Sequence, residues 1–222
     1  MNKSLLLLVS LSIVLGCGGS SNSDNSNSIP LETGFNPKCT PYNATITIYP
    51  SPYEGTLRRC NTSDRQFYVY LPEDYSEVGS SYPAMFSLHG YTSTALTNMS
   101  YTGFMKQADI NDFVVIYPQG LVHETKGGTH WNTDEIGPGN SVNSIEFLES
   151  VLDWVGQNYN IDLNRFYSAG MSNGGFMSYH LACNITSKIS AIASVTGSMS
   201  VFSYDNCNAQ PTSVMQIHGA VD

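Results

Sequence analysis

A serine stands between two glycines at the point where the hydrophobic pattern of the chain changes from that of a strand to that of a helix. Residues 170–174 read Gly-Met-Ser-Asn-Gly, a G-x-S-x-G motif. Residues 165–169 form a short run typical of a buried strand, and residues 175–182 are typical of a helix. This order predicts a tight turn that holds the Ser172 hydroxyl above a sheet, with glycines where side chains would collide with the strand and helix. The alternative is a Gly/Ser-rich turn without chemistry.

The composition is that of a folded domain. The chain has 222 residues, of which 41% are hydrophobic and 11% aromatic, enough for one sizeable domain with a core. Its formal net charge is −9, and no basic stripe is available to neutralise phosphates. Nucleic acid is therefore excluded as an expected partner.

The first residues predict export. Lys3 precedes the apolar run 5–15, which is too short to span a bilayer, and residues 14–17 (Val-Leu-Gly-Cys) resemble a bacterial lipobox. We expect residues 1–17 to be a lipoprotein-type signal peptide including its lipidation site, Cys17. An ordinary secretory signal with a chance cysteine is the alternative. Both predict a secreted protein, and the first predicts one anchored in the cell-envelope membrane by its lipid alone.

Composition also divides the rest of the chain into a tether and a folded domain. Residues 18–36 include a Ser/Asn-rich stretch that cannot bury apolar surface and is predicted to be a tether. Residues 37–222 are predicted to form the folded domain.

Four cysteines remain within that domain. Three pairings of Cys39, Cys60, Cys183 and Cys207 are possible. An even count in an exported protein predicts two disulfides, and we favour Cys39–Cys60 and Cys183–Cys207 because each pair is close in sequence. Free buried thiols are the alternative.

Alternating strands and helices predict a doubly wound, mostly parallel α/β sheet. One helix is expected around residues 145–155, with Asn143 and Glu146 as a capping box at its start. Strands are expected at 45–49, 66–71, 84–88, 113–117, 166–169, 191–195 and 213–217. Functional sites in such sheets lie beyond the carboxyl ends of the strands. The strand ends marked by His89-Gly90, Ser172 and His218-Gly219 should therefore converge.

Several stretches together resemble a known family. They are YVYLP (68–72), LHGYTS (88–93), VVIYPQG (114–120), HWN (130–132), the block 161–183 and IHGAVD (217–222). The sequence resembles the secreted polyhydroxybutyrate-depolymerase-like and feruloyl-esterase-like branch of the α/β-hydrolases. The resemblance implies an α/β-hydrolase fold over residues 66–222 and a Ser–Asp–His triad.

The resemblance assigns roles to individual residues. Ser172 matches the nucleophile and Asp222 the acid, with a terminal solvated carboxylate as the alternative for Asp222. The oxyanion hole would be formed by the backbone N–H of Asn173 and that of Tyr91, an assignment that can shift to Thr92. Trp131 lies in the family's WN motif and is expected to line the substrate pocket. The alternative is a core tryptophan.

No residue matches the family histidine. Chain order in this fold is serine, acid, histidine, and the sequence stops at Asp222. The chain is therefore expected to be a C-terminally truncated version of a longer enzyme, and inactive in this 222-residue form. The histidines that are present are better explained as structural or solvated residues than as the catalytic base. They are His89, His123, His130, His180 and His218. Their spacing does not fit a metal site, so we expect no metal and no cofactor.

The function expected from these features is that of a secreted serine carboxylic-ester hydrolase working through an acyl-enzyme. Its substrates would be feruloyl or acetyl esters on polysaccharide, or a hydroxyalkanoate polyester. Two alternatives remain open, a non-catalytic surface-binding lipoprotein on a hydrolase scaffold and a peptidase of the same fold.

Overall fold

The computed structural model describes residues 34–43, 53–133, 141–185, 187–208 and 210–220. Chain contacts divide the molecule into two units, Met1–Pro30 and Leu31–Asp222, and the described residues belong to the second. The expected signal peptide with Cys17, the expected strand 45–49 and Asp222 lie outside the described residues. Among the described residues, Phe35 is the first that is buried in the core. Within the described ranges, no helix is long and apolar enough to cross a membrane.

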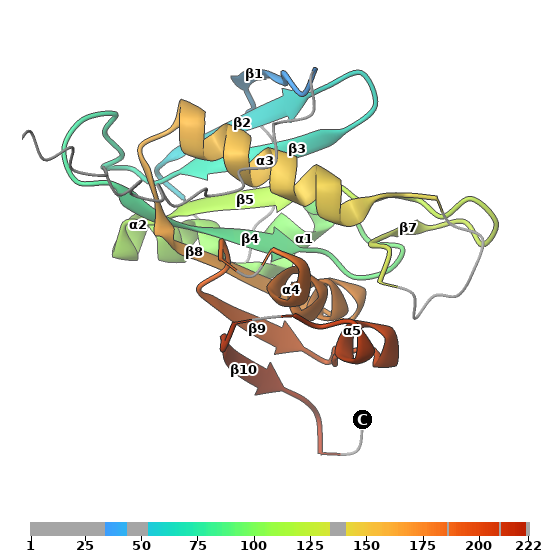
Figure 1. The fold of residues 1–222 in the computed structure, drawn as a ribbon. Coiled ribbons are helices and arrows are strands. Elements are labelled where there is room, and N and C mark those ends of the chain that lie inside the picture. The colour runs from blue at the N-terminus through green and yellow to red at the C-terminus, as the bar shows by residue number, and fades with distance from the viewer. Residues whose placement is uncertain (1–33, 44–52, 134–140, 186, 209, 221–222) are drawn as a thin grey trace, which may run out of the picture. The chain divides into compact units, whose positions relative to one another are not determined.

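An eight-stranded mixed sheet forms the centre of the domain (Figure 1), in the order β1-β2-β3-β5-β4-β8-β9-β10. Its first strands, up to the β3–β5 pair, are antiparallel, and the pairs from β5–β4 to β9–β10 are parallel. The expected α/β sheet is confirmed. The strands are β1 (Lys38–Pro41), β2 (Thr56–Asn61), β3 (Gln66–Leu71), β4 (Tyr82–Leu88), β5 (Val114–Pro118), β8 (Ile161–Met171), β9 (Ala191–Val195) and β10 (Ser213–Ile217).

Both faces of the middle strands are buried, which explains their continuous apolar sequences. In β3, Phe67 and Val69 belong to one hydrophobic cluster, while Tyr68 and Tyr70 belong to a second cluster on the opposite face. The first face is covered by α3 (Ser144–Asn158) and α4 (Asn173–Asn184), and the second by α1 (Ala95–Thr102) and α2 (Phe104–Asn111). The alternation of side chains along each strand therefore places a helix layer on either side.

The predicted helix and its cap are confirmed in α3. The Asn143 side chain accepts a hydrogen bond from the Glu146 N–H (3.0 Å), and its amide nitrogen donates to the Glu146 carboxylate (2.6 Å). The apolar face packs in the core through Leu148, Val151 and Val155. This cap fixes where α3 begins. The hydroxyl of its first residue, Ser144, accepts a hydrogen bond from the N–H of Asn132 (2.9 Å), the residue after Trp131.

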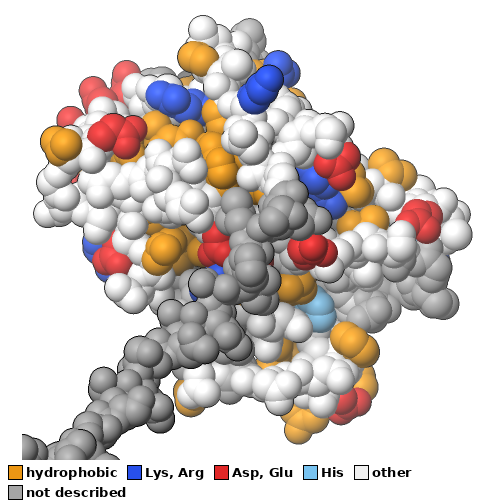
Figure 2. Space-filling view, turned by 45° about the horizontal axis from the view of Figure 1, so that its top comes forward, with side chains coloured by type: hydrophobic (Ala, Val, Ile, Leu, Met, Phe, Trp, Pro, Cys, Tyr) orange, Lys and Arg blue, Asp and Glu red, His pale blue; other side chains and the backbone are white. Residues whose placement is uncertain are grey.

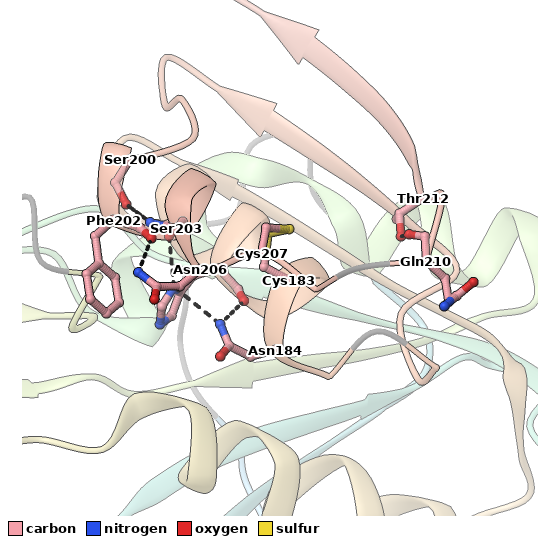
Figure 3. The surroundings of a disulfide bond; sticks show 10 residues. Cys183, Asn184, Ser200, Phe202, Ser203, Asn206, Cys207, Gln210 and Thr212 are labelled. Atoms are coloured by element: carbon pink, nitrogen blue, oxygen red, sulfur yellow. Dashed lines mark hydrogen bonds between the residues drawn. A yellow bond between two sulfur atoms is a disulfide. The ribbon is translucent and has the colours of Figure 1, made fainter.

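Two disulfides join the pairs favoured from the sequence. Cys39 and Cys60 are opposite one another in the β1–β2 ladder. Cys183, in the last turn of α4, bonds Cys207 just after the short helix α5 (Val201–Asp205), as Figure 3 shows. A hydrogen bond between His180 Nδ1 of α4 and the Ser203 hydroxyl of α5 (2.8 Å) also joins these two helices. Within α5, the hydroxyl of its N-cap residue Ser200 donates to the Ser203 hydroxyl (2.9 Å; Figure 3).

The sheet face on the side of α2 is open near its last strands. An apolar groove of about 570 Å³ runs over β4, β8, β9 and β10, and Phe104 and Asn111 of α2 also line it. Val214 is 50% and Met215 62% exposed on β10. On the face drawn in Figure 2 the basic side chains form no continuous stripe.

Candidate active site

Ser172 sits in a strained turn between β8 and α4. Its backbone has φ 53° and ψ −121°, a conformation that residues with a Cβ rarely adopt. Its N–H donates to the Val195 carbonyl (2.8 Å), and its carbonyl accepts from the N–H groups of Gly175 (2.8 Å) and Phe176 (3.0 Å). Such strain persists only where surrounding contacts enforce it, and it is concentrated at functional sites.

Close packing explains the glycines around this serine. A Cβ at Gly170 would collide with the backbone of Gly174, and one at Gly174 would collide with the Leu88 carbonyl. At Gly175 it would collide with the Ser194 hydroxyl. Strand β8, helix α4 and strand β4 therefore approach one another so closely that only hydrogen fits at these positions.

The strand ends at His89-Gly90 and His218-Gly219 lie near Ser172, as expected from the sequence, and the end of β9 at Gly197, which was not expected, joins them. A Cβ built on Gly90, just after β4, would lie 3.7 Å from the Ser172 Cβ. Gly197, which follows β9, packs against the Ser172 carbonyl, and the His218 ring after β10 bonds the Gly197 carbonyl at 2.8 Å. The ends of β4, β8, β9 and β10 thus form one site.

His89 is locked as a neutral ring with a defined tautomer. Its Nδ1 lies 2.8 Å from the Gly90 carbonyl, which can only accept, and its Nε2 lies 2.9 Å from the Gly120 N–H, which can only donate. Nδ1 therefore carries the proton. Burial lowers the pKa of His89 from 6.5 to about 4. This ring supports the turn and is not positioned as a base for Ser172.

Trp131 follows a short hairpin of β6 (Leu121–Val122) and β7 (Thr129–His130). Its side chain is 0% exposed, so the structure favours the core alternative over a place on the wall of a substrate pocket. Its indole N–H donates to the His89 carbonyl (2.9 Å), and the two rings pack with centroids 4.9 Å apart. The main chain of Trp131 bonds the Asn173 side chain.

The structure distinguishes between the two candidates for the second oxyanion donor. The Thr92 N–H donates to the Thr129 carbonyl (2.8 Å) and is thereby engaged. Among the described residues, the hydrogen bond formed by Tyr91 is from its hydroxyl to the Gly127 carbonyl (2.6 Å), and none from its N–H is present. Tyr91 is therefore the better candidate. Asn173 is the first residue of α4, where backbone N–H groups point out of the helix.

The remaining histidines have other partners. His123 and His130 pack ring against ring in the β6–β7 hairpin, and His180 bonds Ser203. Within the described ranges, no histidine ring nitrogen forms a hydrogen bond with Ser172 Oγ, and no group of three or more His, Cys, Asp or Glu could hold a metal ion.

Three structural roles were not predicted from the sequence: that of the Asn173 side chain, that of Gln119 and that of Gly197. Gln119 accepts from the Ala95 N–H (2.9 Å) and so joins the start of α1 to the His89 turn. The sequence offered only local signals for two of these residues. Asn173 lies inside the serine motif, and Gly197 lies two residues after a predicted strand. Their partners are far away in the sequence and only the fold reveals them.

Comparison with known proteins adds to this geometry. Residues 61–208 match a family described as "Putative esterase". A bifunctional acetylxylan esterase/xylanase of Neocallimastix patriciarum is 30% identical over 165 residues, covering 74% of this chain and 22% of that protein. Acetylxylan esterase A of Emericella nidulans is 29% identical over 156 residues, covering 68% of this chain and 48% of that protein. The chain thus spans about half or less of the length of these relatives.

Among solved structures, an acetyl xylan esterase from Aspergillus awamori superposes with a TM-score of 0.54 and 18% identity. The match covers 65% of this chain and 53% of that one. A likeness at this identity shows that the two chains share their fold.

Proposed function

The chain belongs to the esterase family, and on that premise we propose that it is an exported serine carboxylic-ester hydrolase with Ser172 as its nucleophile. The observation that carries the proposal is the strained turn at Ser172, held by the Val195 carbonyl and by the first amides of α4. Attack of Ser172 Oγ on the ester carbonyl would give a tetrahedral oxyanion. The backbone N–H groups of Asn173 and Tyr91 would stabilise that charge. Loss of the alcohol would leave an acyl-enzyme, which water hydrolyses to the acid.

Acetyl or feruloyl esters on a plant polysaccharide are the proposed substrates. Support comes from the relatives, among them acetylxylan esterases and feruloyl esterase D of Neurospora crassa, which is 28% identical over 142 residues. A hydroxyalkanoate polyester as substrate stays a prediction from the sequence. The chain's membership of an esterase family favours ester over amide hydrolysis and a catalytic over a purely binding role.

We further propose that the protein is anchored to the cell envelope through Cys17. Support comes from the lipobox-like residues 14–17 and from the two disulfides, which form in oxidising compartments. Fractionation of cells that produce the wild type and Cys17→Ser tests this point. We expect the wild type in the membrane fraction and the variant outside it. An unchanged distribution would contradict the anchor.

The 222-residue chain by itself is proposed to turn over esters slowly. A serine hydroxyl needs a base to take its proton, and Asp222 would act only by orienting such a base. Among the described histidines none bonds Ser172 Oγ. Imidazole added to the solution should therefore raise the rate by accepting the proton of the Ser172 hydroxyl.

The experiment measures hydrolysis of p-nitrophenyl acetate and methyl ferulate by this chain, with and without imidazole, against Ser172→Ala. After the rate with imidazole alone is subtracted, we expect the imidazole-dependent rate of the wild type to exceed that of the variant about tenfold or more. We also expect a mass increase on Ser172 that corresponds to its acylation. Equal rates in both proteins, with no acyl adduct, would refute the proposed function. Cleavage of an anilide in preference to the ester would indicate a peptidase.

A further inference from the structure

We propose that Trp131 and the side chain of Asn173 are positioning residues that clamp together the two turns carrying the oxyanion donors. The inference rests on the proposed esterase function. It adds to that function the contacts that hold the two oxyanion donors in position. Neither side chain is expected to touch substrate, because Trp131 is 0% and Asn173 3% exposed.

The first half of the clamp joins Trp131 to the nucleophile turn. The Trp131 N–H donates to Asn173 Oδ1 (2.7 Å), and Asn173 Nδ2 donates back to the Trp131 carbonyl (3.0 Å). This reciprocal pair resembles one rung of a β-ladder, with a side-chain amide in place of a neighbouring strand. Two bonds in opposite directions fix both the position and the rotation of the amide. They thereby orient the residue whose backbone N–H is a proposed oxyanion donor.

The second half of the clamp joins Trp131 to the turn after β4. The indole N–H donates to the His89 carbonyl (2.9 Å), and the indole packs on the His89 ring. The same ring donates through Nδ1 to the Gly90 carbonyl, directly before Tyr91. Trp131 therefore contacts both turns at once, although they are separated by more than 80 residues in the sequence.

Neighbouring bonds hold the second turn to the strand that leads into Trp131. The Thr92 N–H donates to the Thr129 carbonyl (2.8 Å), and the Thr129 hydroxyl donates to the Ser93 carbonyl. The Tyr91 hydroxyl donates to the Gly127 carbonyl. Residues 127–131 thus act as a brace across the site, with Trp131 at its end.

These contacts would affect the rate of ester hydrolysis through the positions of the two oxyanion donors. Stabilisation of an oxyanion requires two donors held close to where its charge develops, and a shift of about 1 Å can cost on the order of a hundredfold in rate. Substrate binding before the chemical step depends much less on these donors. Weakening the clamp should therefore lower kcat and leave KM nearly unchanged.

The test uses the imidazole-supported hydrolysis of p-nitrophenyl acetate by the chain. Trp131→Phe removes the indole N–H but keeps a ring against His89, and Asn173→Ala removes the reciprocal pair. The chain offers matched controls: Trp154→Phe changes its other tryptophan, in α3, and Asn98→Ala removes a buried amide that bonds Ser87 at 2.8 Å. We expect kcat to fall about tenfold or more in both clamp variants, with KM within about twofold of wild type. Both controls should stay within about twofold in kcat.

A second readout does not depend on turnover. In the 15N-labelled chain, Trp131→Phe should shift the backbone amide resonances of Tyr91 and Asn173 and speed their hydrogen exchange. Asn173→Ala should do the same at Tyr91, whereas Trp154→Phe should leave both resonances unchanged. Far-UV circular dichroism identifies variants that fold, and either clamp variant alone suffices for the comparison.

The two measurements separate the clamp from the esterase function. If Ser172→Ala hydrolyses ester as fast as the wild type, the proposed function fails and the amide resonances alone decide on the clamp. A folded clamp variant with wild-type kcat would overturn the inference, and so would an unchanged Tyr91 amide resonance in either folded clamp variant.

Discussion

The carbonyl oxygen of Leu88, at the end of β4, lies against Gly174 in the first turn of α4, with no room for a Cβ between them. Adding a Cβ there would also bring it to 2.8 Å from the His89 carbonyl. Both obstacles are backbone atoms, which cannot rotate away as a flexible side chain can. This contact therefore fixes how closely the nucleophile turn approaches the His89 turn.

Gly174→Ala should lower the free energy of unfolding by about 2 to 3 kcal/mol, because the methyl group overpacks a rigid contact. Gly90→Ala is the matched control, since its Cβ would meet its nearest atom, the Met171 carbonyl oxygen, at 3.4 Å. Urea unfolding of both variants measures the difference. Equal stability of the two variants would contradict this account of the glycine.

Ser172→Gly should be more stable than Ser172→Ala by about 1 kcal/mol. Glycine adopts a positive φ without strain, while alanine keeps the Cβ that makes the φ of 53° costly. Neither variant has a nucleophile, so both should lose the imidazole-supported hydrolysis. Urea unfolding with equal m-values gives the comparison. An alanine variant as stable as the glycine variant would argue against strain at the turn.

Acidification should destabilise the fold through His89. Its folded-state pKa of about 4 lies below the ordinary 6.5, because burial disfavours the charged ring. The neutral ring is thus favoured in the folded state. This contribution is fully present above about pH 6.5 and is lost as the pH falls toward 4, by up to about 3 kcal/mol.

Urea unfolding at pH 7 and pH 5 tests that expectation. The wild type should lose stability between the two values, and His89→Gln should lose less because it has no group that titrates there. A pH dependence that is identical in His89→Gln and wild type would refute the assignment to His89.

Removal of the Cys183–Cys207 disulfide should cost roughly 3 kcal/mol. The bond closes a loop with a sequence separation of 24, and the value follows from the entropy of the unfolded chain. The double variant Cys183→Ser/Cys207→Ser isolates the effect. The His180–Ser203 hydrogen bond should keep α5 on α4 when the protein is folded. A loss below about 1 kcal/mol would show that the loop is ordered without the bond.

The sequence predicted the elements whose cause is local. Continuous apolar runs marked β3, β4 and β5 because these strands are buried on both faces. Asn143 and Glu146 marked the start of α3 because a cap acts within one turn. Elements with weaker local signals, such as α5 and the β6–β7 hairpin, were not anticipated. They are short and are held mainly by long-range bonds, including the disulfide at Cys207 and the contacts of Thr129.

For the site, the sequence by itself determined where a reactive serine can stand, because G-x-S-x-G between a strand and a helix needs only neighbouring residues to form its turn. It also narrowed the oxyanion donors to Asn173 and either Tyr91 or Thr92. Only the tertiary structure favoured Tyr91, because the Thr92 N–H is engaged by Thr129, a residue far along the chain. It likewise buried Trp131 between His89 and Asn173. Hydrogen-bond partners and burial depend on which distant segments meet, and no pattern of adjacent residues encodes that.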